Sequence, residues 1–167
     1  MDTPREIVLV AHNLRSCHNV GSLLRTAEGL GVTEVVLSGY TPYPLLSDDK
    51  RLPHEAQKIN KQIHKTALGA ESTLRWVREE DISVTIARLK NHDLQILAVE
   101  QTSDALLMPD FKPPKKLALI VGREVEGIEP EVLAACDNAL VIPMFGQKES
   151  FNVVQAAAMA LYHCTFS

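Results

Sequence analysis

Residues 142–162, IPMFGQKESFNVVQAAAMALY, combine three local patterns in a short span. The first residues are apolar and typical of the end of a strand. The next residues include Gly, Gln, Lys, Glu and Ser, which are typical of a loop, and the last part is a helical pattern rich in Ala, Val and Met. Strand, loop and helix in this order form the repeating unit of an α/β sheet, so we expect the rest of the chain to repeat it.

The same alternation recurs along the whole chain. Apolar, β-branched runs predict strands at residues 7–11, 34–38, 95–99, 117–121 and 139–142. A further short strand is expected within residues 73–77. Helical patterns lie at residues 19–30, 54–68 and 83–92, in a short segment opened by Pro130, and from Val153 onward. The order predicts one α/β domain over residues 1–167, with a mainly parallel sheet and helices on both of its faces.

The composition is that of a globular protein. The chain has 167 residues, 46% of them hydrophobic and 23% charged, which suits one domain. No apolar run approaches the roughly 18 residues that cross a bilayer, so no membrane association is expected. The start, MDTPREIVLVAHN, lacks the pattern of a secretory signal, which predicts a cytoplasmic location. Widely spaced Cys17, Cys136 and Cys164 predict reduced thiols, and the scattered histidines predict no metal site.

Charge is unevenly distributed along the chain. The net charge of −4 argues against binding of nucleic acid by bulk electrostatics alone. Residues 50–65, however, carry five Lys or Arg residues and one acid. Within them, a helix would place four basic side chains on one stripe: His54, Lys58, Lys61 and Lys65. This stripe is either an ordinary solvated helix face or a surface that binds phosphates.

Three polar loops follow predicted strands, where ligands of parallel α/β sheets bind. The first loop lies in HNLRSCHNVGSLLRTAEGLGV, residues 12–32. Asn19 is expected to cap a helix, and Gly21 allows another backbone or a ligand to come close. Arg25 follows six residues after Asn19, and we expect both side chains to face a similar direction near the helix start. The alternative is a plain cap and a surface arginine.

The second loop lies in VGREVEGIEPEVL, residues 121–133. Gly122 and Gly127 allow tight turns around a ligand, and Glu124 and Glu126 supply carboxylates. The same pattern also describes an ordinary loop between a strand and a helix. Neither GxGxxG nor GxxxxGK[ST] is present in the sequence, which argues against a nucleotide-binding domain of the Rossmann or flavodoxin type.

The third loop connects Ile142-Pro143-Met144 to the last helix. Its apolar start provides walls suited to a flat ring such as adenine. Ser150 and Asn152 supply a hydroxyl and an amide at the helix start, although either could simply be a helix cap. The small residues of the helix allow close packing against another segment or another subunit.

Taken in order, these loops resemble the three motifs of the SpoU/TrmH branch of the SPOUT RNA methyltransferases. The matching segments are Asn19–Ala27 (NVGSLLRTA), Val121–Ile128 (VGREVEGI), and Ile142–Met144 with Ser150–Val153 (IPM and SFNV). The resemblance spans nearly the whole chain. It implies a C-terminal trefoil knot that binds S-adenosylmethionine, a homodimer, and methylation of ribose 2′-hydroxyls in tRNA or rRNA, with S-adenosylhomocysteine as the product.

The resemblance also assigns site residues. It implies cofactor contacts at Val99, Gly122, Ile142, Met144, Ser150, Phe151 and Val153. It implies catalytic roles for Asn19, Arg25, Glu124, Ser150 and Asn152. Phe151 departs from the family, which more often has an aliphatic residue there. Arg25 matches the family's proposed base, but a guanidinium stays protonated at neutral pH, so stabilising a developing alkoxide or holding a phosphate are alternative roles.

The resemblance gives the basic stripe a function. Residues 1–167 match a minimal catalytic unit without an accessory RNA-binding domain, so the stripe of residues 54–65, together with Lys112, Lys115 and Lys116, becomes the candidate RNA surface. A compact dimer can grip a stem-loop, which favours tRNA as the substrate. An rRNA methyltransferase, or a non-catalytic knotted factor that binds RNA or the cofactor, are the alternatives.

Overall fold

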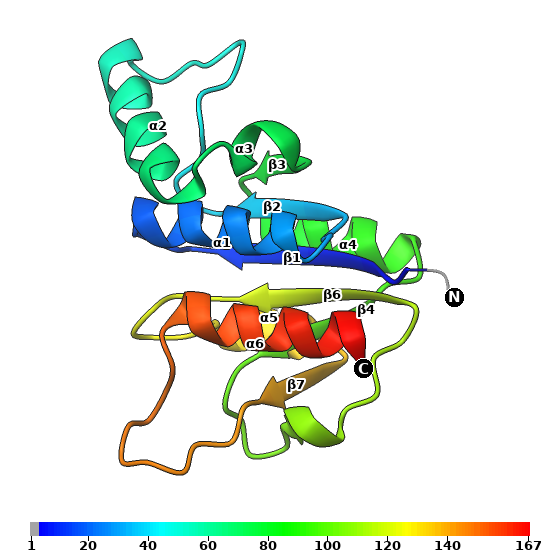
Figure 1. The fold of residues 1–167 in the computed structure, drawn as a ribbon. Helices are drawn as coiled ribbons and strands as arrows, with labels where there is room; N and C mark the ends of the chain where they lie inside the picture. The colour runs from blue at the N-terminus through cyan, green and yellow to red at the C-terminus, as the bar shows by residue number, and fades with distance from the viewer. Residues whose placement is uncertain (1–3) are drawn as a thin grey trace.

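The computed structural model describes residues 4–167 and consists of one seven-stranded sheet covered by helices (Figure 1). The strands, in chain order, are β1 Glu6–His12, β2 Glu34–Ser38, β3 Trp76–Glu79, β4 Gln95–Val99, β5 Leu106–Leu107, β6 Lys116–Val121 and β7 Asn138–Val141. Their order across the sheet is β3-β2-β1-β6-β4-β7-β5, and each neighbouring pair is parallel. The predicted parallel α/β fold is confirmed. The first three residues of the predicted domain lie outside the described range.

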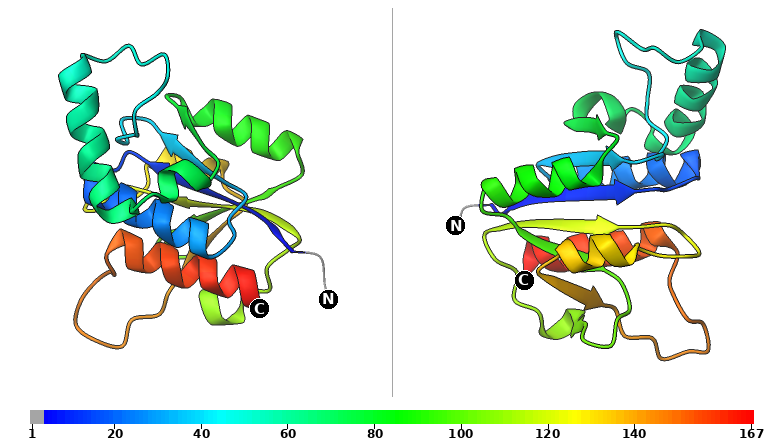
Figure 2. Two further views of the ribbon diagram at one scale, coloured as in Figure 1. Left: turned by 45° about the horizontal axis from the view of Figure 1, so that its top comes forward. Right: turned by 180° about the vertical axis from the view of Figure 1, so that it is seen from behind.

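The helices connect the strands. They are α1 Cys17–Gly29, α2 Pro53–Ala67, α3 Ala70–Thr73, α4 Ile82–Asn91, α5 Pro130–Ala135 and α6 Val153–Phe166, with a 3₁₀ helix, η1, at Met108–Asp110. Helices α1 and α6 cover one face of the sheet, while α4 and α5 cover the other (Figure 2). Within residues 4–167, no helix has the length and apolar character needed to cross a bilayer.

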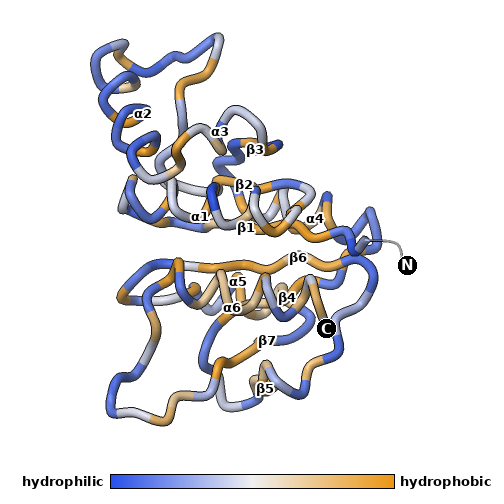
Figure 3. The backbone as a smooth tube through the Cα atoms, viewed as in Figure 1, coloured by the Kyte–Doolittle hydropathy of each residue, from blue (hydrophilic) through white to orange (hydrophobic). Residues whose placement is uncertain are grey.

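The central strands are apolar because both of their faces are buried. Leu9 and Val10 are neighbours on β1 that point to opposite faces, and both are fully buried. Leu9 belongs to the core beneath α1 and α6, whereas Val10 belongs to the core beneath α4 and α5. Figure 3 shows the resulting continuous hydrophobic runs along β1 and β6. Two cores, one on each side of one sheet, therefore set the position of every loop at the strand ends.

Two local predictions differ from the structure. The strand expected within residues 73–77 begins only at Trp76, because residues 70–73 form the short helix α3. Asn19 does not cap α1, so that prediction is wrong. Ser16 is the cap, and its Oγ accepts a hydrogen bond from the Asn19 backbone N–H at 3.1 Å. The helix begins two residues before Asn19, which places Asn19 in its first turn.

Gly21 has the close neighbour that the sequence predicts. A Cβ atom at this position would lie 2.9 Å from the backbone nitrogen of Ala67 and would also collide with Ile63 O and Thr66 Oγ1. The neighbour is therefore the last turns of α2, which pack against the start of α1. Because α1 follows the carboxyl end of β1, this contact holds α2 at the same edge of the sheet (Figure 1).

Candidate functional site

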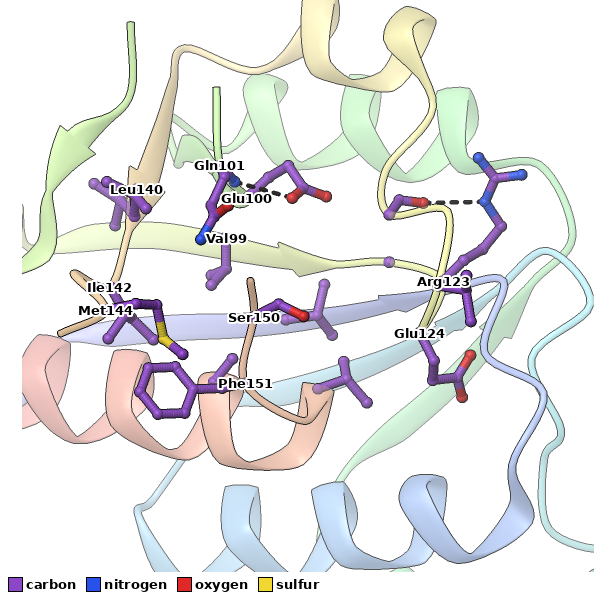
Figure 4. A pocket seen from close by; sticks show the side chains of 17 residues that line it. Val99, Glu100, Gln101, Arg123, Glu124, Leu140, Ile142, Met144, Ser150 and Phe151 are labelled. Atoms are coloured by element: carbon purple, nitrogen blue, oxygen red, sulfur yellow. Dashed lines mark hydrogen bonds between the residues drawn. The ribbon is translucent and has the colours of Figure 1, made fainter. Parts of the chain in front are cut away.

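A pocket opens at the carboxyl ends of β4, β6 and β7 (Figure 4). All seven residues with predicted cofactor contacts line it: Val99, Gly122, Ile142, Met144, Ser150, Phe151 and Val153. They come from the ends of three strands, the loop of residues 142–152 and the start of α6. Chain segments more than 50 residues apart in sequence thus meet in one place, because parallel strands end at a common edge.

The pocket has an apolar side and a polar side. Ile142, Met144 and Phe151 contribute apolar surface, and the Phe151 side chain is partly exposed. Glu100, which directly follows β4, contributes a carboxylate on the polar side. Glu100 and Gln101 were not predicted as site residues. Both directly follow a predicted strand, which is where ligands of parallel sheets bind, so their position could have indicated them.

Glu100 also holds the opposite pocket wall in place. Its Oε2 accepts a hydrogen bond from the backbone N–H of Ile128 at 3.0 Å, and its Oε1 accepts one from Gln101 N at 2.9 Å. Gly127 sits against this carboxylate with φ +74°, and a Cβ atom there would lie 3.2 Å from Glu100 Cδ as well as colliding with Oε2. The sequence predicts that Gly127 allows a tight turn. In the structure, its positive φ and the neighbouring Glu100 carboxylate both disfavour a side chain at this position.

The loop of residues 142–152 is tied to the same strand end. The Gln101 side-chain amide donates a hydrogen bond to the Glu149 carbonyl oxygen at 2.6 Å. At the other end of the loop, Asn152 caps α6, because its Oδ1 accepts a hydrogen bond from the Val154 backbone N–H at 2.9 Å. Ser150 lines the pocket, whereas Asn152 lies outside the set of lining residues and acts as a cap in the described part of the chain.

A second hollow adjoins the pocket, and Glu124 and Val125 belong to both. The hollow is lined by Arg15, Ser16, Asn19, Glu124, Val125 and Glu126. The Asn19 side-chain amide lies 3.4 Å from Glu124 Oε1, and the backbone N–H groups of Arg15 and Ser16 lie 3.4 and 3.5 Å from the same oxygen. The structure therefore brings together the polar residues of the first and second motifs, Asn19 and Glu124.

Arg25, like Asn152, is a candidate residue that lines neither the pocket nor the hollow. It is exposed on α1. Six residues along an α-helix correspond to a rotation of about 240° and a rise of about 9 Å, so Arg25 and Asn19 face different directions. The prediction that they face a similar direction is wrong.

The four residues of the basic stripe, His54, Lys58, Lys61 and Lys65, are all exposed on α2. Helix α2 lies at the carboxyl edge of the sheet, the edge at which the pocket opens (Figure 1). Lys115 and Lys116 lie at the opposite edge, where β6 begins, and Lys116 Nζ is 3.5 Å from Glu6 Oε2. The expected joint surface of the stripe with these lysines is therefore not formed.

The cysteines are unsuited to nucleophilic chemistry. All three are free, as predicted. Burial raises the pKa of Cys136 and of Cys164 to about 11, so both stay protonated at neutral pH. Over residues 4–167, no group of three or more His, Cys, Asp or Glu side chains is placed to hold a metal ion.

Comparison with known proteins agrees with this geometry. Residues 6–162 match the model of the SpoU rRNA Methylase family. The chain belongs to this family. It is 27% identical to the tRNA (guanosine(18)-2′-O)-methyltransferase of Aquifex aeolicus, over 95% of this chain and 68% of that enzyme. It is 28% identical to the 23S rRNA (guanosine-2′-O-)-methyltransferase RlmB of Neisseria meningitidis, over 93% of this chain and 56% of that enzyme.

Solved structures of SpoU proteins share the fold. The SpoU methyltransferase AviRb from Streptomyces viridochromogenes, in complex with AdoMet, superposes with a TM-score of 0.81 at 19% identity, over 99% of this chain and 58% of that chain. An RNA 2′-O ribose methyltransferase superposes with a TM-score of 0.78 at 27% identity, over 98% of this chain and 57% of that chain. This SpoU chain thus spans between half and about two-thirds of the length of these four proteins.

Proposed function

We propose that this SpoU chain transfers a methyl group from S-adenosylmethionine to a ribose 2′-hydroxyl of RNA. The observation that carries the proposal is the position of Glu124, which lies on the wall shared by the pocket and the hollow. A cofactor in the pocket and a ribose in the hollow would meet at this residue. Family membership and the curated relatives support the same reaction.

The pocket residues fit the proposed cofactor. The apolar side chains of Ile142 and Met144 suit the flat adenine ring, and the Ser150 hydroxyl can form a hydrogen bond with a polar group of the ligand. The carboxylates of Glu100 and Glu124 supply negative charge opposite a positively charged sulfonium ligand. When bound, S-adenosylmethionine supplies an electrophilic methyl group and leaves as S-adenosylhomocysteine.

The chain's own residues position the hydroxyl for this reaction. Transfer breaks a sulfur–carbon bond, forms a bond between carbon and the ribose 2′-oxygen, and releases the hydroxyl proton. The Glu124 carboxylate can accept a hydrogen bond from the 2′-hydroxyl, and the Asn19 amide holds that carboxylate in place. Arg25 stays cationic, so its part would be to stabilise the alkoxide or to hold a phosphate.

We also propose that the chain acts as a homodimer in the cytoplasm. Helix α6 presents a stripe of exposed apolar side chains formed by Met159, Tyr162 and Phe166, which are 37%, 62% and 66% exposed. An apolar stripe at the spacing i, i+3, i+7 on a helix is typical of a surface that another chain covers. Since Arg25 lies outside the pocket of its own chain, its proposed role requires the RNA or a second chain to bring it near the ribose.

The trefoil knot remains part of the proposal. Two features support it: α6 packs against α1 and β6 near the centre of the sheet, while the strand before it, β7, lies toward one side of the sheet, next to β4 and β5. The chain must therefore return across the sheet through the loop of residues 142–152 (Figure 1). A knot would make the pocket's two walls, residues 122–127 and 142–151, a single interlocked unit.

The proposed substrate is tRNA, with rRNA as the alternative, because the relatives include enzymes of both kinds. The test is incubation of the protein with tritiated S-adenosylmethionine and, separately, total tRNA or rRNA from a strain that lacks its gene. Label in tRNA alone would support the proposal, and label in rRNA alone would replace tRNA by rRNA. Binding of the cofactor without label in either pool would instead support a non-catalytic binding factor.

A further inference from the structure

A partly buried polar cluster lies beside the loop of residues 122–129, outside the pocket. Its centre is Glu129, the residue before α5, which lines neither the pocket nor the hollow. Glu129 Oε1 accepts a hydrogen bond from the Asn13 side-chain amide at 2.8 Å, and Oε2 lies 3.3 Å from His12 Nε2. Oε2 is fully buried and makes no well-aligned hydrogen bond, so His12 is the group that faces it.

His12 ties this carboxylate to the sheet. It is the last residue of β1, is buried, and its Nδ1 lies 3.0 Å from Ser38 Oγ, at the end of β2. Burial lowers the pKa of His12, which keeps the ring neutral at physiological pH. In a neutral ring with its proton on Nε2, Nδ1 is free to accept a hydrogen bond from the Ser38 hydroxyl. Nε2 then lies 3.3 Å from Glu129 Oε2 and 3.2 Å from Asn13 Nδ2.

The loop between Gly122 and Glu129 is closed at its base. Gly127 N donates a hydrogen bond to the Arg123 carbonyl oxygen at 3.1 Å, and Arg123 Nε donates one to Gly127 O at 3.0 Å. Arg123 Nε also lies 3.7 Å from Glu129 Oε1. The tip of this closed loop carries Glu124. The loop is thus held from the β1 side by Glu129 and from the β4 side by Glu100.

We propose that Glu129, held by His12 and Asn13, is a positioning residue that fixes the loop of residues 122–129 and thereby the pocket wall. This inference rests on the proposed function, because the wall is the proposed cofactor site. Glu129 acts through the loop and not on the reacting atoms, since it lines no part of the pocket. A carboxylate is suited to this place because it accepts a hydrogen bond from Asn13, lies 3.3 Å from His12 Nε2 and faces the Arg123 cation.

The test compares three variants of the full chain by amide hydrogen exchange without ligand and by calorimetric titration with S-adenosylmethionine. Glu129→Ala removes the carboxylate. Glu129→Gln keeps a side-chain oxygen that can accept the hydrogen bond from Asn13. Its amide group can donate a hydrogen bond to His12 Nε2 when the imidazole proton is on Nδ1. Glu131→Ala is the matched control, because Glu131 is an exposed carboxylate in the first turn of α5.

We expect Glu129→Ala to exchange faster at residues 123–128 and to bind the cofactor about tenfold more weakly, the loss typical of a charged hydrogen bond. Glu129→Gln should restore both values to within about threefold, and Glu131→Ala should match the unaltered protein. Unchanged exchange in Glu129→Ala would overturn the proposal. Faster exchange throughout the chain would also overturn it, because Glu129 would then support the fold and not the loop.

The exchange measurement separates this inference from the proposed function. If the unaltered protein does not bind S-adenosylmethionine, the proposed function fails, yet exchange at residues 123–128 still decides whether Glu129 fixes the loop. If the unaltered protein binds the cofactor and Glu129→Ala binds it equally well, the proposed cofactor site stands and the positioning role is overturned.

Discussion

The Asn19 side-chain amide lies 3.4 Å from Glu124 Oε1, which joins the first turn of α1 to the tip of the loop after β6. This contact connects two motifs that are more than 100 residues apart in the sequence. Glu124 reaches the pocket from one side and the hollow from the other. Its carboxylate is therefore placed between the proposed cofactor and the proposed ribose.

Replacing Glu124 tests this placement. Glu124→Gln keeps the size of the side chain but removes the charge that faces the 2′-hydroxyl, so we expect kcat to fall by about tenfold or more with a smaller change in KM. Steady-state methyl transfer to RNA measures both constants. Glu126→Gln is the control, because Glu126 lies in the same loop and hollow but not in the pocket. An equal loss of activity in the two variants would argue against a special role for Glu124.

Gly127 is expected to be essential for stability. Gly127→Ala introduces a Cβ atom against the Glu100 carboxylate at φ +74°, which should reduce the free energy of unfolding by about 1–3 kcal/mol. Urea denaturation measures this change. In Gly146→Ala, the added Cβ atom has no heavy atom within 4 Å, so that variant should unfold like the unaltered protein. Equal stability of the two variants would show that the loop adapts freely to a side chain.

Stability should depend on pH through His12. The pKa of His12 is lowered by burial and by the Arg123 cation, while Glu129 raises it and opposes them; Ser38 and Asn13 are its uncharged neighbours. The unfolded chain therefore binds a proton more readily than the folded chain as pH falls below about 6.5. The contribution of the neutral His12 ring to the free energy of unfolding is complete above that pH. It is lost as the pH falls toward the lower pKa that His12 has in the folded state.

Urea denaturation between pH 7.5 and pH 5.5 measures this dependence. We expect the free energy of unfolding of the unaltered protein to fall across this interval, and His12→Gln to show a smaller fall. His54→Gln is the control, because His54 is an exposed histidine on α2. A fall of the same size in His12→Gln would contradict the assignment to His12.

The basic stripe on α2 should contribute to RNA affinity. Replacing Lys58, Lys61 and Lys65 with Gln removes three charges from α2, at the edge of the sheet where the pocket opens. RNA should therefore bind more weakly, and the slope of log K against log salt should become shallower by about two to three. Fluorescence anisotropy at several salt concentrations measures the slope. The matched control replaces Lys112, Lys115 and Lys116, two of which lie at the opposite edge of the sheet. If the control lowers the slope equally, the stripe has no special role.

The sequence was informative where structure follows from local pattern or from sheet geometry. The apolar runs located the central strands because both strand faces are buried, as Leu9 and Val10 show. The pocket residues Val99, Gly122 and Ile142 were expected together from the resemblance to the SpoU/TrmH motifs. The structure brings them together because Val99 ends β4, the other two directly follow β6 and β7, and parallel strands end at one edge.

Sequence reasoning failed where the structure depends on side-chain direction or on distant partners. Asn19 and Arg25 are close in sequence, yet the helical rotation between them separates their side chains. Glu129 resembled an ordinary residue before a helix, because its partners His12 and Asn13 lie more than 100 positions away. Helix α3 was not predicted either, because its four residues are too few to show a helical period.

The position of the transferred methyl group is the decisive measurement for the proposed reaction. RNA treated with the protein and S-adenosylmethionine is digested to nucleosides and analysed by mass spectrometry, with Glu124→Gln as a matched sample. Ribose 2′-O-methylation predicts a new nucleoside that carries its added methyl on the ribose, and much less of it with the variant. A methyl group on a base, or no methylated nucleoside with any RNA despite cofactor binding, would contradict ribose 2′-O-methylation as the function of this chain.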